Sequence, residues 1–167
     1  MKNLKEANLS ISGKNILITG ASRGIGRSLS IELSKLGANI ILLSKNESLL
    51  ENIYDEISDK TETDPSIIGC DLNLLDEPRS QEISNIISEN YIDLDCIIHN
   101  AAIIEKMSNI EEYDLVSWEK VMKVNLTSSF LLTKFLLPNM ENAKNPRIIF
   151  TSSSVAFKGK AFWGAYS

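Results

Sequence analysis

The chain has 167 residues, of which 43% are hydrophobic, and its formal net charge is −5 at pH 7. This length and composition fit one globular domain and exclude a disordered polyelectrolyte. The sequence holds no apolar run long enough to cross a membrane, and its polar start, Met1 to Glu6, lacks the apolar core of a secretory signal. The acidic balance argues against nucleic acid as a partner, because phosphate binding needs a basic face.

The cysteines and the single histidine exclude two further classes of site. Cys70 and Cys96 lie in separate apolar runs and form neither a C-x-x-C motif nor a metal cluster. With one histidine in the chain, a zinc site is not expected. Unpaired thiols fit a reducing compartment, so we expect a cytoplasmic protein.

Short apolar runs alternate with helical patterns along the whole chain. Continuous apolar runs predict strands at 15–19, 39–43, 66–70, 94–99 and 147–151. Apolar residues at helical spacing predict helices at 24–36, around 49–57, around 83–87 and at 117–137, the first closed by Gly37 and the last stopped by Pro138. This alternation predicts an α/β fold with a doubly wound parallel sheet in the order 3-2-1-4-5, forming a single domain over residues 1–167.

The helix predicted at 117–137 is apolar on nearly every side. One interpretation is a helix buried deep against the sheet. The other is that its outer stripe forms a subunit interface, since a helix packed on a sheet needs only one apolar stripe.

A glycine loop directly follows the first predicted strand, with the sequence TGASRGIG over residues 19–26. Gly20 permits a tight turn, Gly24 allows a phosphate to approach the backbone, and Gly26 allows the helix to pack close to the strand. Free N–H groups at the start of the following helix would face the phosphates. The order of strand, loop and helix therefore predicts a nucleotide-phosphate site.

The pattern T-G-x-x-x-G-I-G resembles the cofactor signature of the short-chain dehydrogenase/reductase family. Further landmarks follow in the family's order: Asp71 and Leu72 after the third strand, His99-Asn100-Ala101-Ala102 after the fourth, Asn125 on the long helix, and Ser152 to Ser154 before Tyr166. The resemblance implies a Rossmann-type fold and a nicotinamide cofactor. It places that cofactor on the following residues: Gly20, Ser22, Arg23, Gly24, Ile25, Gly26, Ser44, Lys45, Asp71, Leu72, Asn100 and Ala101.

The same resemblance implies hydride transfer between the nicotinamide and a small-molecule carbonyl or alcohol. Tyr166 corresponds to the family's acid/base, which must reach the oxygen where a proton moves. A serine hydroxyl would donate to that oxygen; spacing from Tyr166 favours Ser153, whereas local similarity favours Ser154. Asn125 corresponds to the active-site asparagine, although a bond to the backbone at a helix kink is an alternative role.

The end of the second strand predicts which nicotinamide cofactor binds. A site that prefers NAD usually places an acid there, whereas this chain has Ser44 followed by Lys45. Arg23 in the glycine loop adds a second cation. Two cations favour the 2′-phosphate, so we expect NADP(H) rather than NAD(H).

The chain departs from the family pattern in three places. His99 replaces an asparagine, where a packing role is expected, and Ala102 replaces a glycine. The family's Y-x-x-x-K lysine would fall three residues beyond Ser167, and its last strands would follow, so the chain is expected to be C-terminally incomplete relative to the family. Strand 147–151 would then be an edge and Tyr166 would lack a helix to hold it.

These departures leave more than one function open. The leading hypothesis is a nicotinamide-dependent oxidoreductase. The alternative is a nucleotide-binding fragment or degenerate copy that binds NADP(H) but turns over poorly, unless Lys158 or Lys160 supplies the missing cation. A flavodoxin-like or sugar-nucleotide binder is a third hypothesis. The identity of the substrate is not encoded in a recognisable motif.

Overall fold

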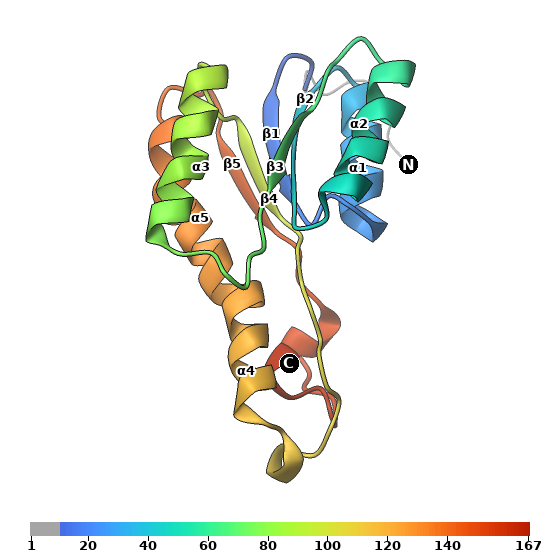
Figure 1. The fold of residues 1–167 in the computed structure, drawn as a ribbon, viewed down its shortest axis with the longest axis vertical. Coiled ribbons are helices and arrows are strands. Elements are labelled where there is room, and N and C mark those ends of the chain that lie inside the picture. The colour runs from blue at the N-terminus through green and yellow to red at the C-terminus, as the bar shows by residue number, and fades with distance from the viewer. Residues whose placement is uncertain (1–10) are drawn as a thin grey trace.

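A five-stranded parallel sheet forms the centre of the structure, a computed structural model that describes residues 11–167 (Figure 1). The strands run in the order β3-β2-β1-β4-β5, and every neighbouring pair is parallel, which confirms the predicted topology. Their bounds are β1 Asn15–Thr19, β2 Asn39–Ser44, β3 Ser66–Gly69, β4 Cys96–His99 and β5 Arg147–Phe150. The polar start at Met1 to Glu6, where the sequence shows no secretory signal, lies outside the described residues.

The middle of the sheet is apolar because both of its faces are covered. Leu17 of β1 lies in register between Ile41 of β2 and Ile97 of β4, and all three side chains are fully buried. A strand buried on both faces reads as a continuous apolar run rather than as an alternating one. This explains why the runs in the sequence are unbroken.

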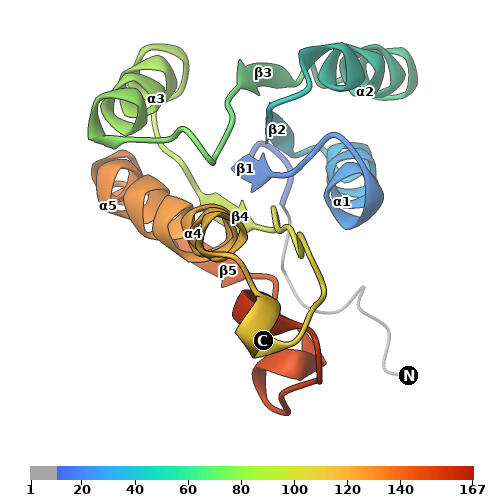
Figure 2. The ribbon, with the colours of Figure 1, turned by 60° about the horizontal axis from the view of Figure 1, so that its bottom comes forward.

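Helices form a layer on each face of the sheet (Figure 2). α1 (Gly24–Lys35) and α2 (Glu47–Lys60) bury their apolar stripes in one core cluster with β1 and β2. α3 (Glu77–Asn90) and α5 (Ser128–Met140) do the same on the opposite face. These two layers hold the strands so that all their carboxyl ends meet at one edge.

Gly37 closes α1, as its position in the sequence predicts. Its φ of +84° lies in the left-handed region that favours glycine. The Gly37 N–H donates to Ser34 O at 2.8 Å and the Ala38 N–H donates to Leu33 O at 3.2 Å, which satisfies the last carbonyls of the helix. The chain can therefore turn sharply into β2.

The prediction of one helix at 117–137 is wrong in two respects. The segment consists of α4 (Leu115–Met122), a π-helical turn (Lys123–Thr127) and α5, and α5 continues past Pro138 to Met140. Pro138 is exposed and lies in the last turn, where its ring and its missing N–H disturb only the end of the ladder. One stripe of the long helix faces the core, as the first interpretation of its apolar surface expects, while Leu126 and Phe130 stay exposed, so a subunit interface remains a prediction.

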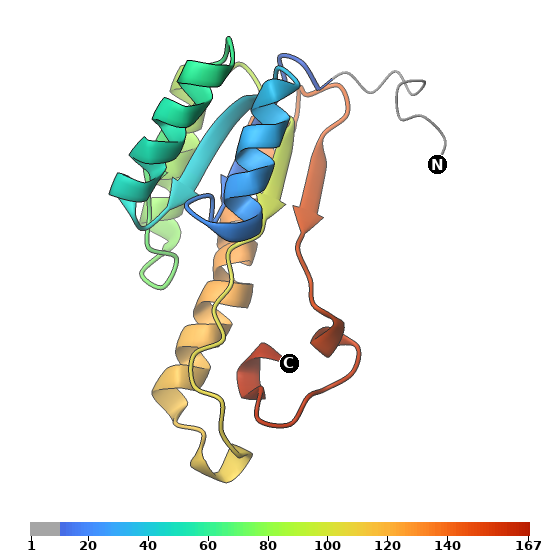
Figure 3. The same ribbon diagram turned by 90° about the vertical axis from the view of Figure 1, so that its right-hand side faces the viewer.

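Beyond the carboxyl edge of the sheet, two segments far apart in sequence form a lower lobe (Figures 1 and 3). One is the connection from β4 into α4, and the other is the segment 154–167. The Ser108 N–H donates to Phe162 O at 3.1 Å and joins them. No helix within residues 11–167 has both the length and the hydropathy needed to cross a membrane.

Candidate functional site

A cleft of about 630 Å³ opens at the carboxyl edge of the sheet. Of the residues singled out in the sequence, it brings together Gly20, Ser22, Arg23, Gly24, Ile25, Ser44, Lys45, Asp71, Leu72, Asn100, Ala101, Ser153 and Tyr166. Gly26 and Asn125 do not line it. Gly26 lies beneath the loop, and Asn125 lines an adjoining cavity of about 150 Å³.

The glycine loop has the geometry that its sequence predicts at Gly20 and Gly26. Gly20 has a φ of +66°, and a Cβ there would lie 2.9 Å from Ala101 Cα. A Cβ on Gly26 would overlap Gly20 O and lie 2.7 Å from Asn100 Nδ2. Gly24 has a φ of +54° and open space where its Cβ would be, so the start of α1 is accessible from the cleft.

Thr19 fixes the glycine loop to the loop after β4, a role that the sequence analysis missed. Its buried hydroxyl accepts hydrogen bonds from the N–H groups of Asn100 and Ala101, both at 3.0 Å. The Asn100 side chain donates back to Thr19 O at 3.1 Å. The threonine of the T-G motif was the feature of the sequence from which this contact could have been predicted.

One end of the cleft is cationic. Arg23 and Lys45 are exposed, line the cleft, and form no ion pair within the part of the chain that the structure describes. Ser44, at the end of β2, is buried and donates a hydrogen bond to Ser22 Oγ at 2.9 Å. Two unneutralised cations beside a small hydroxyl residue form a local site of positive potential.

The segment after β3 forms the side wall of the cleft. The Asn73 N–H donates to Asp71 Oδ1 at 2.9 Å, which holds a turn that presents Asp71 and Leu72 to the cleft. Cys70 lies next to them, and burial raises the pKa of its thiol, so it stays protonated at neutral pH.

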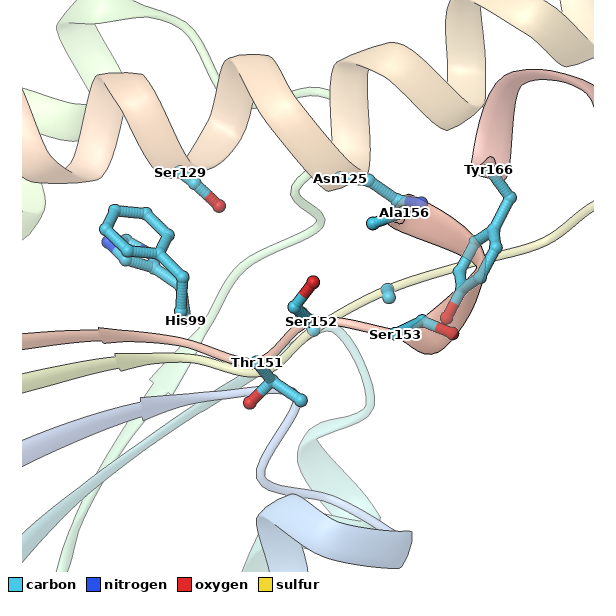
Figure 4. Close-up of a pocket in the computed structure, with 11 residues that line it drawn as sticks. His99, Asn125, Ser129, Thr151, Ser152, Ser153, Ala156 and Tyr166 are labelled. Carbon is cyan, nitrogen blue, oxygen red and sulfur yellow. The ribbon is translucent and has the colours of Figure 1, made fainter. Parts of the chain in front are cut away.

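Ser153 and Tyr166 lie at the other end of the cleft and line both cavities. Their hydroxyl groups point toward the same part of the smaller cavity (Figure 4). Tyr166 is carried by a single 3₁₀ turn, Gly164–Tyr166. Ser154, the alternative serine, begins another 3₁₀ turn and lines neither cavity.

Asn125 lies in the π-helical turn, and its side chain is fully engaged. Its Nδ2 donates to Ile103 O at 2.8 Å, and the Ile103 N–H donates to Asn125 Oδ1 at 2.9 Å. The structure therefore shows a bond to the backbone at a helix irregularity, the second of the two roles that the sequence left open. Turns of this kind inside α-helices are frequent at functional sites.

His99, which departs from the family pattern, is packed in the wall of the smaller cavity. Its ring stacks on Phe150 with centroids 4.8 Å apart, and Nε2 lies 2.9 Å from Thr133 Oγ1. Burial lowers the pKa of His99 to about 4, so the imidazole is neutral at physiological pH. Ala102, the other departure, lines both cavities.

An ion pair lines the cleft and was not foreseen from the sequence. Lys120 Nζ lies 2.7 Å from Glu105 Oε1, and both residues line the cleft. Glu105 has a φ of +57°, an uncommon conformation for a residue with a side chain. Lys158 and Lys160 line neither cavity, and Lys160 Nζ lies over the Trp163 ring at 4.3 Å.

The strand order, the glycine loop after β1 and a cleft at the carboxyl ends of the strands define a Rossmann-type α/β fold. The family model for short chain dehydrogenase matches residues 14–167, and the chain belongs to that family. The sequence had indicated this family from its motifs, and the match confirms it.

Individual relatives agree with this membership. The chain is 36% identical to the uncharacterized oxidoreductase YciK of Escherichia coli K12 over 94% of its own length and 62% of that protein. It is 32% identical to the 3-oxoacyl-[acyl-carrier-protein] reductase FabG of Aquifex aeolicus, over 95% of this chain and 63% of the relative. A family member from Shigella flexneri 2a, crystallised with NADP, superposes with a TM-score of 0.91 at 35% identity, over 94% of this chain and 66% of the other. The chain thus spans about three fifths of the length of the curated relatives that it matches.

Proposed function

We propose that this protein is an NADP(H)-dependent oxidoreductase that transfers a hydride between the nicotinamide and a small-molecule carbonyl or alcohol. One observation carries the proposal: a single cleft joins the glycine loop, Arg23 and Lys45 at one end to the Ser153 and Tyr166 hydroxyls at the other. In this proposal the chain forms one dinucleotide-binding domain.

The shape of the cleft fits a dinucleotide. Gly24 lines the cleft and has open space where a Cβ would lie, so phosphate oxygens could approach the N–H groups at the start of α1. Asp71 and Leu72 would hold the adenine side, and Asn100 and Ala101 the middle of the cofactor. When bound, the nicotinamide supplies or accepts the hydride.

Preference for NADP(H) follows from the charges in the cleft. Arg23 and Lys45 are both free to bind a 2′-phosphate, and the buried Ser44 places no carboxylate at the end of β2 where one would repel it. Two structural relatives agree, since the Shigella protein was crystallised with NADP and an Escherichia coli CFT073 relative, 36% identical, with NADPH.

The proton chemistry falls to the hydroxyl groups of Ser153 and Tyr166, which both line the smaller cavity. Tyr166 donates a proton to the substrate oxygen as it gains negative charge, or accepts one in the reverse direction. Ser153 donates a hydrogen bond to the same oxygen and stabilises its developing charge. Ser153 is favoured over Ser154 because it lines both cavities, which Ser154 does not.

Asn125 acts in this proposal by holding the active-site wall in place. Its paired hydrogen bonds fix Ile103, which lines the cleft directly after the loop that follows β4. The π-helical turn brings this side chain to the smaller cavity without a break in the long helix.

We also propose that the chain associates through the outer face of its long helix. Leu126 and Phe130 are about three fifths exposed on the outer face of the long helix, and we expect them to bury against a second copy of the chain. Light scattering of Phe130→Glu against the wild type tests this association.

Two free thiols fit a cytoplasmic location, which fractionation of the native cell tests.

A titration with NADPH, followed by quenching of tryptophan fluorescence, tests the cofactor site directly. The Trp163 ring lies 5.6 Å from that of Tyr166, and Trp118 lies in α4 against the Tyr113 ring. We expect saturable NADPH binding that is tighter than NADH binding. Binding without reduction of any carbonyl would favour the alternative, a nucleotide-binding protein without turnover, and absence of binding would refute both.

A further inference from the structure

We propose that Tyr113 is a positioning residue for Tyr166: its ring lies against Gly164 and fixes the turn that carries the Tyr166 phenol into the cavity. The role in catalysis rests on the proposed function. The docking of the two segments does not, because it follows from packing alone.

The turn that carries Tyr166 does not fix this side chain by itself. It is three residues long and is held by two short backbone bonds, from the Tyr166 N–H to Trp163 O at 3.1 Å and from the Ser167 N–H to Gly164 O at 3.2 Å. The Tyr166 hydroxyl makes no hydrogen bond to any residue between 11 and 167. The position of the phenol must therefore come from what the turn packs against.

The Tyr113 ring is what the turn packs against. A Cβ on Gly164 would lie 2.7 Å from Tyr113 Cδ2 and 2.9 Å from Cζ, so the ring covers the Gly164 backbone closely. Gly164 also has a φ of +43°, which a residue with a side chain rarely adopts. Both the close approach and the backbone angle require glycine two residues before Tyr166.

Tyr113 is itself held from behind by α4. Its ring meets Trp118 edge-on, with centroids 6.2 Å apart and an interplanar angle of 87°. The carboxylate of Asp114, next in the chain, accepts a hydrogen bond from the Ser117 N–H at 2.8 Å and so fixes the start of α4. The ring is thus anchored to a helix that continues into the π-helical turn of Asn125.

A backbone hydrogen bond also joins the two segments. The Ser108 N–H bonds to Phe162 O, and Phe162 has a φ of +72°, so the segment before Gly164 is also fixed in an unusual conformation. Trp163 then lies with its ring 5.6 Å from that of Tyr166. Figures 1 and 3 show the two segments side by side in the lower lobe.

The direct test is fluorine NMR on protein labelled with 3-fluorotyrosine at its four tyrosines. The Tyr166 resonance is assigned by its loss in Tyr166→Phe. In Tyr113→Ala we expect it to move to its position in the unfolded chain, while Tyr54 and Tyr91, which lie in and after helices of the main unit, keep theirs. In Tyr113→Phe, which retains the ring, it should stay in place. An unshifted Tyr166 resonance in Tyr113→Ala would overturn the proposal.

Gly164→Ala carries the same test if Tyr113→Ala fails to fold, since its methyl group would meet the Tyr113 ring. We expect Gly164→Ala to shift the Tyr166 resonance, and we expect Gly159→Ala, whose Cβ would meet nothing within 4 Å, to leave it in place. An unshifted Tyr166 resonance in Gly164→Ala would contradict the contact between Gly164 and the Tyr113 ring.

Measurements of turnover distinguish a failure of the positioning role of Tyr113 from a failure of the proposed function. Tyr113→Ala should lower kcat for carbonyl reduction by about tenfold or more, with the Kd for NADPH within about twofold of the wild type, because misplacing a reacting group affects the chemical step. If the fluorine signals behave as expected but Tyr166→Phe leaves turnover unchanged, the docking stands and the catalytic assignment of Tyr166 fails. If Tyr166→Phe abolishes turnover but Tyr113→Ala leaves both kcat and the Tyr166 resonance intact, the positioning role fails alone.

Discussion

The Ser44 hydroxyl donates a hydrogen bond to Ser22 Oγ at 2.9 Å, which ties the end of β2 to the glycine loop. Lys45 follows Ser44 and Arg23 follows Ser22, so this bond keeps Lys45 and Arg23 on the same side of the cleft. The two loops therefore act together on whatever phosphate lies between them.

Reversing the charge of Lys45 should change cofactor preference. We expect Lys45→Asp to weaken NADPH binding by about 1–3 kcal/mol and to leave NADH binding nearly unchanged, because only NADPH carries the 2′-phosphate. Lys144→Asp is the matched control, since Lys144 is exposed and precedes β5 at the opposite edge of the sheet. Competitive titrations with both nucleotides measure the effect, and equal losses for NADPH and NADH would show that Lys45 does not contact the 2′-phosphate.

A methyl group at Gly26 should disturb the loop that holds the phosphates. We expect Gly26→Ala to lower the free energy of unfolding by about 1–3 kcal/mol through overpacking and to weaken NADPH binding as well. Gly159→Ala is the control, because a Cβ there meets nothing within 4 Å. Urea denaturation compares the two. A Gly26→Ala protein as stable as the wild type would contradict the close packing of α1 on the loop.

The stability of the protein should fall in mild acid because of its one histidine. Burial lowers the pKa of His99 to about 4, whereas the unfolded chain takes up a proton near the ordinary value of 6.5. The folded state therefore loses stability as the pH falls from about 6.5 to about 4, by about 2 kcal/mol between pH 7 and pH 5.

His99→Asn isolates this contribution, because the carboxylates titrate equally in both proteins. Urea denaturation at each pH should show a smaller loss of stability in acid for the variant than for the wild type. The histidine ring signals in a proton NMR titration give the pKa directly. A value near 6.5 in the folded protein would contradict the burial of the ring.

Removing the Asn125 amide should loosen the cleft wall. Asn125→Ala leaves the N–H and C=O of Ile103 without their partners, and we expect it to lower the free energy of unfolding by about 1–3 kcal/mol. Ser129→Ala, which alters the same small cavity but breaks no hydrogen bond that the structure describes, should stay near the wild type. Equal stability of the two variants would count against the paired bonds.

The sequence predicted the fold well because the fold depends on local patterns. Unbroken apolar runs, the glycine loop and Gly37 placed the strands, the first crossover and the strand order correctly. Pro138 misled the prediction, since its position in the last turn of α5 could not be read from the sequence. The π-helical turn was not predicted for a similar reason, because the hydrogen bonds between Asn125 and Ile103 join two segments that are distant in the sequence.

The sequence predicted those site residues that belong to a motif. It did not predict those that reach the site through packing between separate segments. Residues of the glycine loop, the end of β2 and the segment after β5 meet in one cleft, as their order along the chain implies. Thr19, the Lys120–Glu105 ion pair and Tyr113 depend on contacts between separate segments. Thr19 stands in the T-G motif, but no periodicity or short motif encodes the other two contacts.

We propose that Ser153 and Tyr166 activate a carbonyl that NADPH, bound in this cleft, reduces. Single-turnover oxidation of NADPH by the protein, measured by absorbance across a panel of ketones and aldehydes, tests it most directly. We predict oxidation with at least one carbonyl, and a loss of about a hundredfold or more in Tyr166→Phe and in Ser153→Ala, while Ser154→Ala and the NADPH affinity stay close to the wild type. Oxidation that persists undiminished in Tyr166→Phe, or NADPH that binds tightly and reduces no carbonyl, would contradict the claim.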